Sequence, residues 1–443
     1  MNMKKYNEIL IGSGPAAYKM SNLLAKTSHS VLVIEGFEFG GTCPNYGCEP
    51  KIFLEGAART VLQSQQLVGR GISQPAKLDW QALMKTKLSR FDPWPDETHS
   101  IIEKSHDVEE GYAHFIGDKT VSVNGRQYQA DHIIIATGQT PNILDIPGKE
   151  YLHTNYDLLS LKTLPSRVAV IGAGFVGLEL ATLVAAAGAD VTMIIHSDRV
   201  LREFTRAEDK MLVEAMKERG IKFIFNANTQ KISQLKDELI IATDQGEVRA
   251  DYILNVTGRH PNIEKLALDN TNIKYDHHGI KVDDHMMTSV DGIYAIGDVV
   301  SRQEPKLTPV AEFEGQYLFD YLTGKTTQPI TYPLIGQAAF TFPEVARVGV
   351  NADSVAGDSQ YQIKRIPLKY GSLYAGQNDQ VSTLTLVFKG KQLVGASEIG
   401  DYAADDINNL IPIIGLQIDG NEYRQKVMTI YPTLGDKIAG LLP

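Results

Sequence analysis

Cysteine is nearly absent from this sequence, which has only Cys43 and Cys48 in 443 residues. A secreted domain stapled by disulfides normally has more cysteines in a much shorter chain, so a structural disulfide framework is excluded. Two cysteines this close together in a protein of a reducing compartment indicate redox chemistry instead.

The sequence also lacks a basic block and a long apolar run. It has 53 Asp and Glu against 43 Lys and Arg, a formal net charge of −10. Clustered Lys and Arg hold nucleic acids and anionic membrane surfaces, so we expect neither as a partner. No apolar stretch is long enough to span a membrane, and the strand-like run at residues 8–11 starts too early for a cleavable signal peptide to precede it. We therefore expect a soluble, cytoplasmic protein.

The chain is long enough for two or three domains, and one pattern occurs twice in it. Residues 8–35 read as a strand, a glycine-rich turn, a helix to about residue 26 and a second strand. Residues 167–195 repeat this order, with a helix through residue 187. Each segment is typical of a βαβ dinucleotide-binding unit. The sequence therefore predicts two nucleotide sites.

Glycines carry the chemistry of both turns. The first turn contains Gly12 and Gly14, and the second contains Gly172, Gly174 and Gly177. Glycine lets the backbone turn sharply and approach a pyrophosphate, which then lies at the positive end of the following helix. One such motif can be a mere strand-to-helix turn. Here a strand precedes and a helix follows in both copies, which favours two real sites.

The cysteines belong to the segment Gly40-Gly41-Thr42-Cys43-Pro44-Asn45-Tyr46-Gly47-Cys48-Glu49-Pro50-Lys51. Because Pro50 suits the first turn of a helix, we expect Cys48 at a helix N-terminus. The helix dipole and Lys51 would lower the pKa of the Cys48 thiol and make it reactive near neutral pH. Cys43, expected on the preceding loop, can close a short disulfide with it.

This segment resembles the redox-active motif of the pyridine nucleotide-disulfide oxidoreductases, which include glutathione reductase, dihydrolipoyl dehydrogenase and mercuric reductase. The resemblance covers nearly the whole chain. It includes both glycine-rich turns, the strand ends Thr137-Gly138 and Thr257-Gly258, and the segments at residues 288–298, 307–311 and 342–349.

The resemblance implies an α/β fold class with two Rossmann-like dinucleotide-binding domains and a C-terminal α+β dimerisation domain. The FAD-binding domain would comprise residues 1–155 and 275–325, and the NAD(P)H-binding domain residues 156–274. The C-terminal domain would comprise residues 326–443. The protein would be a homodimer with a shared active site.

The resemblance also implies the cofactors, FAD and NADPH, and the residues that bind them. Glu35 would hold the adenosine ribose of FAD, and Asp298 its ribityl chain. The other residues implied at the FAD site are Gly12, Gly14, Ala17, Thr42, Lys51, Thr137, Gly138 and Gly297. Those implied at the NAD(P)H site are Gly172, Gly174, Gly177, Arg202 and Gly258.

Electrons would pass from the pyridine nucleotide through FAD to a Cys43–Cys48 disulfide and on to a small-molecule acceptor. By resemblance, Cys48 is the thiol stacked on the flavin, and Cys43 is the thiol that meets the acceptor. Lys51 matches a lysine beside the flavin that pairs with a glutamate of the second unit, where Glu179 stands.

The pyridine nucleotide is predicted from the end of the second strand of the repeat. NAD-preferring units usually have an acid there to hold the ribose 2′-hydroxyl, but this chain reads Ile195-His196-Ser197. Arg202 matches one of two arginines that hold the 2′-phosphate in glutathione reductase. We therefore favour NADPH, with NADH possible.

The chain departs from the family near its C-terminus. Tyr431-Pro432-Thr433 and Asp436 stand where the family has His-Pro-Thr and Glu, and a phenol is a poor base near neutral pH. We assign Tyr431 and Asp436 to the catalytic site, with Tyr431 as a proton or hydrogen-bond donor. Asn22 and Gln316 replace arginines that bind glutathione.

The acceptor therefore stays open at this point: a low-charge disulfide or persulfide, an oxidant, or a metal ion. Alternatives are dihydrolipoyl dehydrogenase-like or glutathione reductase activity, or a flavoprotein that senses redox state and turns over little. We predict no resident metal site.

Overall fold

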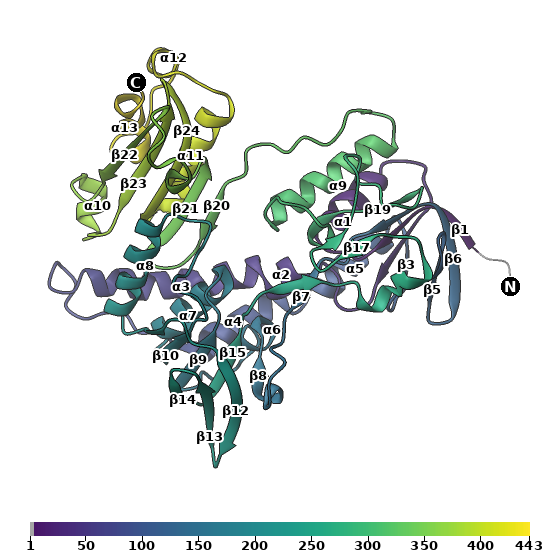
Figure 1. The fold of residues 1–443 in the computed structure, drawn as a ribbon, viewed down its shortest axis with the longest axis horizontal. Coiled ribbons are helices and arrows are strands. Elements are labelled where there is room, and N and C mark those ends of the chain that lie inside the picture. Colours follow the sequence, from purple (N-terminus) through teal and green to yellow (C-terminus); the bar gives the residue numbers. More distant parts are fainter. Residues whose placement is uncertain (1–3) are drawn as a thin grey trace. The chain divides into compact units, whose positions relative to one another are not determined.

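The computed structural model describes residues 4–443, which have the mixed α/β fold that the sequence predicts (Figure 1). They form two compact units. The first contains residues up to 51, 86–142 and 258–331, and the second contains residues 52–85, 143–257 and 332–443. Among residues 4–443, no helix is long and apolar enough to cross a membrane.

The first unit is built on one sheet with helices packed against it. Its elements are β1 (Lys4–Ile11), α1 (Pro15–Leu24), β2 (Val31–Glu35), α2 (Thr42–Tyr46), α5 (Trp94–Glu103), β3 (Asp107–Glu110), β4 (His114–Gly117), β5 (Thr120–Val123), β6 (Arg126–Ile135), β7 (Gln139–Pro141), β16 (Arg259–Pro261), η2 (Glu264–Leu266), η3 (Leu268–Asn270), β17 (Tyr275–Asp276), β18 (Gly279–Ile280), β19 (Ile293–Ala295), η4 (Gly297–Val299) and α9 (Thr308–Leu322). Two helices, α3 (Cys48–Gln66) and α4 (Trp80–Phe91), include residues of both units.

The main sheet of the first unit is parallel where the glycine-rich turn lies. Its order is β3-β2-β1-β6-β5-β4, and β19 also pairs with β6. Strands β1, β2, β3, β6 and β19 run parallel, so their carboxyl ends share one edge. Helices α1 and α9 pack side by side (Figure 1). The buried face of α1 follows helical spacing, with Ala16, Met20 and Leu24 in the core.

The second unit contains several sheets. Its elements are η1 (Lys149–Tyr151), β8 (Leu152–His153), α6 (Asn155–Leu158), β9 (Arg167–Ile171), α7 (Phe175–Ala186), β10 (Asp190–Ile194), α8 (Arg206–Glu218), β11 (Lys222–Ile224), β12 (Thr229–Leu235), β13 (Glu238–Thr243), β14 (Gly246–Ala250), β15 (Tyr252–Asn255), β20 (Gln337–Ala339), β21 (Glu344–Gly349), η5 (Ala352–Val355), β22 (Tyr361–Pro367), α10 (Ser372–Gly376), β23 (Thr383–Lys389), β24 (Gln392–Gly400), α11 (Ala403–Gly415), α12 (Gly420–Lys426) and α13 (Leu434–Leu441).

The second glycine-rich turn lies in a parallel sheet of order β11-β10-β9-β15-β8. Strands β12, β13 and β14 form a small antiparallel sheet. Strands β20 to β24 form an antiparallel sheet in the order β20-β21-β24-β23-β22, against which α11 packs. Strand β23 is buried along most of its length and pairs antiparallel with both β22 and β24.

Candidate active site

The two cysteines lie at neighbouring helices of the first unit. Cys48 is the first residue of α3, as the sequence predicts, whereas Cys43 lies in the short helix α2 and not in a loop. Both are present as thiols. Gly47 joins the helices, and a Cβ there would lie 2.9 Å from the Thr42 carbonyl oxygen and 3.1 Å from Cys43 Cα. Glycine at this position therefore lets the chain fold back so that the thiols hydrogen bond.

The hydrogen bond between the thiols affects the acidity of Cys43. The hydrogen bond to Cys48, together with burial, raises the pKa of the Cys43 thiol above its usual value. This direction favours Cys48 as the thiol that carries the charge when the pair is singly ionised.

Two helix N-termini meet at Cys48. Its sulfur atom lies 3.7 Å from the Thr308 hydroxyl, and Thr308 is the first residue of α9. The N-cap of α9, Leu307, provides no side-chain cap, so the first N–H groups of this helix are available to an anion. The positive ends of α3 and α9 both stabilise negative charge at this sulfur.

The first glycine-rich turn has the geometry of an anion site. Gly12 has a φ of +107°, and a Cβ there would overlap the Ala136 carbonyl oxygen. Gly14 is the N-cap of α1 and offers no side-chain cap, and Ala17 is buried in the first turn of α1. The free N–H groups of α1 can therefore receive a phosphate.

Glu35 ends β2 and fastens this turn to the sheet. Its Oε2 accepts hydrogen bonds from the Ser13 N–H at 2.9 Å and the Ser13 hydroxyl at 2.7 Å, and its Oε1 accepts one from Phe37 N–H at 2.9 Å. Burial raises the pKa of Glu35, and the Ser13 bonds partly offset this rise. The predicted contact of Glu35 with a ribose stays a prediction.

Thr137 and Asp298 follow neighbouring parallel strands, β6 and β19, and so lie at the same edge of the sheet. The Thr137 hydroxyl and Asp298 Oδ1 are both buried, and neither has a hydrogen-bond partner in the described chain. Burial raises the pKa of Asp298, and Arg302 and Lys306 offset part of the rise. Because buried polar groups are normally hydrogen bonded, these atoms fit a ligand that carries hydroxyls, as FAD does.

The second glycine-rich turn repeats the first. Gly172 has a φ of +113°, and a Cβ there would overlap the Val256 carbonyl oxygen. Gly174 is the N-cap of α7, and a Cβ on it would meet nothing within 4 Å. Gly177 lies against the turn, where a Cβ would be 3.0 Å from the Gly172 carbonyl oxygen. The open space at Gly174 is where a pyrophosphate can approach α7.

Arg202 lies in the loop after β10, on the surface. Its neighbour Arg199 shapes this loop from within, because its Nη2 donates to the carbonyl oxygens of Leu201 and Phe204 at 3.0 and 2.8 Å. Arg202, unlike Arg199, is exposed and can reach an anion in solvent.

Gly138 and Gly258 precede strands β7 and β16, and each glycine accepts a hydrogen bond from the residue that follows the other glycine's strand. Gly138 has a φ of +66° and Gly258 a φ of +114°. The Gly138 carbonyl accepts from Asn262 N–H, and the Gly258 carbonyl accepts from Asn142 N–H, each at 3.0 Å. Strands β7 and β16, which begin right after these glycines, pair antiparallel. The Thr-Gly strand ends that the sequence singles out are therefore built alike.

Lys51 and Glu179 belong to different units, and their pairing stays a prediction. Glu179 lies in α7 and is 4% exposed. Its Oε1 accepts a hydrogen bond from Phe340 N–H at 2.8 Å. Glu179 is thus a buried side chain held by the backbone between β20 and β21.

Tyr431 is 78% exposed. Asp436, in the first turn of α13, accepts a hydrogen bond from Thr433 N–H at 3.0 Å. Asp436 is thus seen here as a helix-capping residue, and it holds the segment that carries Tyr431. Their catalytic roles stay predictions.

Sequence reasoning missed two contacts that bear on the site. Thr308 lies in the segment at residues 307–311 that carries part of the family resemblance, but nothing in the local sequence indicated that its hydroxyl faces Cys48. Arg259 Nη2 donates to the Gln139 carbonyl at 2.5 Å and lies 3.4 Å from the Thr42 hydroxyl. Its position directly after the Thr-Gly strand end was the only available signal.

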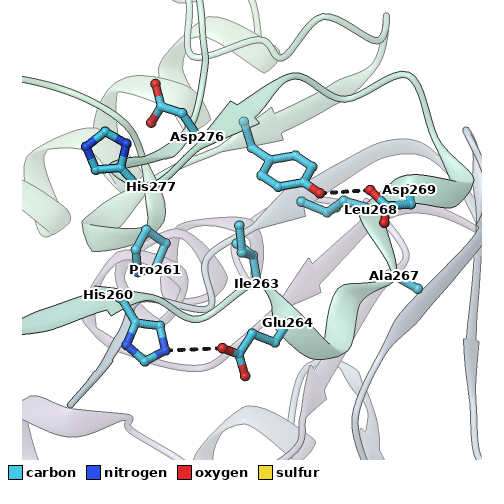
Figure 2. Close-up of a pocket in the computed structure, with 10 residues that line it drawn as sticks. His260, Pro261, Ile263, Glu264, Ala267, Leu268, Asp269, Asp276 and His277 are labelled. Atoms are coloured by element: carbon cyan, nitrogen blue, oxygen red, sulfur yellow. Dashed lines mark hydrogen bonds and ion pairs between the residues drawn. The ribbon is translucent and has the colours of Figure 1, made fainter. Parts of the chain in front are cut away.

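A cavity of about 400 Å³ lies elsewhere in the first unit, between residues 260–269 and 275–277 (Figure 2). None of the predicted site residues lines it. Three of its side chains are carboxylates, Glu264, Asp269 and Asp276, and Tyr275 donates a hydrogen bond to Asp269 at 2.8 Å. These carboxylates would repel a pyrophosphate, so the cavity is unsuited to a dinucleotide. In residues 4–443, no three His, Cys, Asp or Glu side chains are placed to hold a metal ion.

The chain is similar to known redox enzymes along its length. The sequence model of the family described as "Pyridine nucleotide-disulphide oxidoreductase" matches residues 6–315. A glutathione reductase of Nostoc sp. is 30% identical over 427 residues, 91% of this chain and 92% of the relative. A mercuric reductase of Staphylococcus aureus is 30% identical over 418 residues, 91% of this chain and 76% of the relative.

Solved structures agree on the fold. The HOCl-induced flavoprotein disulfide reductase RclA from Escherichia coli has a TM-score of 0.88 at 22% identity, covering 99% of both chains. RclA has also been solved as a Cu(II) complex, which is 21% identical and covers 98% of this chain and 99% of the other. With the dithiol and the two glycine-rich turns in place, the chain belongs to the pyridine nucleotide-disulfide oxidoreductase family, whose members are flavin-dependent enzymes that use FAD and NAD(P)H.

Proposed function

We propose that this protein uses NADPH to reduce its FAD, passes two electrons to a Cys43–Cys48 disulfide and reduces a small disulfide, an oxidant or a metal ion. The observation that carries the proposal is the pair of hydrogen-bonded thiols, Cys43 in α2 and Cys48 at the start of α3. When bound, FAD would accept hydride from the nicotinamide and deliver its electrons to the disulfide.

The proposed domains follow the repeated turns. We assign FAD binding to residues 1–155 and 275–325, NAD(P)H binding to residues 156–274, and dimerisation to residues 326–443. Support comes from the matching geometry at Gly12 and Gly172. In the C-terminal segment, Met428, Ile430 and Tyr431 are 99%, 79% and 78% exposed, which suits an interface with a second copy.

Each thiol has its own task in this scheme. The Cys48 thiolate would lie against the flavin under the N-termini of α3 and α9. Cys43 would attack the acceptor: for a disulfide, the Cys43 sulfur bonds to one acceptor sulfur and the other leaves as a thiol. Cys48 then displaces the first sulfur, which restores the Cys43–Cys48 disulfide. Tyr431 of a second subunit would donate a proton or hydrogen bond to the leaving group.

The acceptor class is inferred from charge. Gln316 donates to Asp320 at 2.9 Å, and Asn22 is an exposed amide on α1. Neither supplies the positive charge that a dianionic tripeptide disulfide needs. The relatives' names favour keeping a metal ion among the possible acceptors, since one is a mercuric reductase and RclA was solved with Cu(II).

The test is NADPH consumption with a panel of acceptors: glutathione disulfide, oxidised lipoamide, Cu(II) and Hg(II). We expect glutathione disulfide to be turned over at least about tenfold more slowly than the best acceptor, because charge-assisted contacts of roughly 1.5–3 kcal/mol each are missing. Tyr431→Phe should slow acceptor reduction and leave flavin reduction by NADPH unchanged.

The panel also separates the alternatives. Rapid turnover of glutathione disulfide would indicate a glutathione reductase, and rapid turnover of lipoamide with NADH a dihydrolipoyl dehydrogenase. If no acceptor supports turnover although NADPH reduces the flavin, the redox-sensing alternative replaces the proposal.

A further prediction concerns the choice between NADPH and NADH. NADPH should reduce the flavin faster than NADH, because Arg202 can bind the 2′-phosphate and the strand end has no acid to bind the 2′-hydroxyl. Arg202→Ala should lower the ratio of the flavin reduction rate with NADPH to the rate with NADH by about tenfold or more, because a charge-assisted contact is lost. Rapid-mixing kinetics of flavin reduction measure it, with the exposed Arg70→Ala of the second unit as control. Equal rates with both nucleotides in the unaltered protein would refute this assignment.

A further inference from the structure

A buried group of charges follows strand β19. The Arg302 side chain is 6% exposed, and the Glu314 side chain of α9 is fully buried. Arg302 Nη1 donates to the Gly297 carbonyl at 2.6 Å and to Glu314 Oε2 at 3.0 Å, and it forms an ion pair with Glu314 Oε1 at 2.8 Å. Glu314 Oε2 also accepts from Gly297 N–H at 2.6 Å. Glu314 therefore holds Arg302 against the backbone that leads into Asp298.

Only one nitrogen of the Arg302 guanidinium is used in these bonds. Nε and Nη2 are buried and have no hydrogen-bond partner in the described chain. Nη2 lies 3.9 Å from Asp298 Oδ1, which is beyond hydrogen-bond range and which also has no hydrogen-bond partner. Leaving a buried charged group without its hydrogen bonds is costly, so the arrangement is complete only when a ligand supplies them.

The unused atoms define the chemistry of that ligand. Asp298 Oδ1 needs a donor such as a hydroxyl, whereas Arg302 Nε–H and Nη2–H need acceptor oxygens, best an anionic pair. The neighbouring residue, Gly297, lies against the first turn of α1, where a Cβ on it would be 3.2 Å from Ala16 Cβ. The cluster is thus beside the helix N-terminus that can receive a phosphate.

We propose that Arg302 is a cofactor-binding residue of this protein, whose Nε–H and Nη2–H bind an anionic oxygen of the polyol–phosphate part of FAD next to the hydroxyl that Asp298 holds. Glu314 is its positioning residue. The inference rests on the proposed function and adds a residue outside the two glycine-rich turns.

A lysine would be a poor substitute at this position. The planar guanidinium can bond Glu314 through one nitrogen and present two further N–H groups in a fixed direction, which a single ammonium cannot do. A lysine, Lys306, already lies nearby, donating to the Val300 carbonyl. Burial, followed by the charge of Arg302, lowers the pKa of Lys306 to about 8.

The test measures the affinity of the FAD-depleted protein for FAD. Binding is monitored by the quenching of flavin fluorescence. Arg302→Met should raise Kd about tenfold to a hundredfold, and Arg302→Lys should raise it less, because charged hydrogen bonds are lost wholly or in part. Added salt should weaken binding less in Arg302→Met than in the unaltered protein. Arg126→Met is the matched control: Arg126 belongs to the same unit and pairs with Glu109 at 2.9 Å, but is 70% exposed. Its Kd should not change.

A second variant separates binding from folding. Arg302→Met alone leaves the buried Glu314 without its cation, so the Arg302→Met/Glu314→Gln double variant removes both charges. Its Kd should stay at least about tenfold above that of Glu314→Gln alone. If the two Kd values agree, Arg302 does not bind FAD and the proposal is wrong. If neither methionine variant folds, Arg302→Lys decides, and an unchanged Kd overturns the proposal. Failure of the unaltered protein to bind FAD would instead refute the proposed function.

Discussion

Replacing Cys43 with serine should lower acceptor reduction by at least about a hundredfold and leave flavin reduction by NADPH nearly unchanged, because serine supplies no thiolate nucleophile. Cys48→Ser should also stop turnover, but for another reason: the disulfide cannot form. It should in addition remove the long-wavelength absorption band expected from the Cys48 thiolate beside the flavin. Stopped-flow absorbance during reduction by NADPH measures both effects.

The two variants control each other, since both remove one sulfur atom from the same pair. If Cys48→Ser kept the band and Cys43→Ser lost it, the roles of the two thiols would be reversed. The pH dependence is a further check. The raised pKa of Cys43 means that more of its thiolate forms as pH rises, so acceptor reduction by the unaltered protein should increase through and above neutral pH. A plateau from about pH 6.5, the ordinary range of a histidine, would indicate a general base that the proposed mechanism does not include.

Substituting Gly172 with alanine should destabilise the fold and abolish reduction by NADPH while FAD stays bound. A Cβ at residue 172 would overlap the Val256 carbonyl oxygen, and the φ of +113° is strained for alanine. Strain of this kind costs about 1–3 kcal/mol, and relief of the overlap would displace the turn that faces the pyrophosphate. Denaturant unfolding and NADPH titration measure the two effects.

Gly174→Ala is the matched comparison in the same turn. A Cβ at residue 174 would meet nothing within 4 Å, and this residue does not have a positive φ. The variant should therefore unfold like the unaltered protein but bind NADPH more weakly, because the added methyl group occupies space that the pyrophosphate needs. Equal stability of Gly172→Ala and Gly174→Ala would contradict the close approach at Val256.

The two glycine-rich turns and the position of Cys48 could be predicted from the sequence, because each depends on a few neighbouring residues. The turns at Gly12 and Gly172 lie between a strand and a helix, and a positive φ beside a neighbouring carbonyl requires glycine. The position of Cys48 at the start of α3 followed from Pro50 in the same way. Cys43 was misplaced in a loop, since a helix as short as α2 has too little sequence to show a period.

Contacts between segments far apart in the sequence could not be predicted from local sequence patterns. Thr308 reaches Cys48, and Glu314 holds Arg302, only because α9 packs beside α1. Asp436 could be assigned from the sequence only by its place in a motif, whereas the structure has it as the cap of α13.

The sequence by itself determined the α/β class, the two glycine-rich turns and the redox pair, because each depends on backbone conformation within a few residues. Only the tertiary structure decided the direction of the pKa shift at Cys43 and which buried atoms of Arg302 and Asp298 have no hydrogen-bond partner in the described chain. The physical reason is that pKa values and unsatisfied hydrogen bonds depend on burial and on neighbours in space, which segments far apart in the chain supply together.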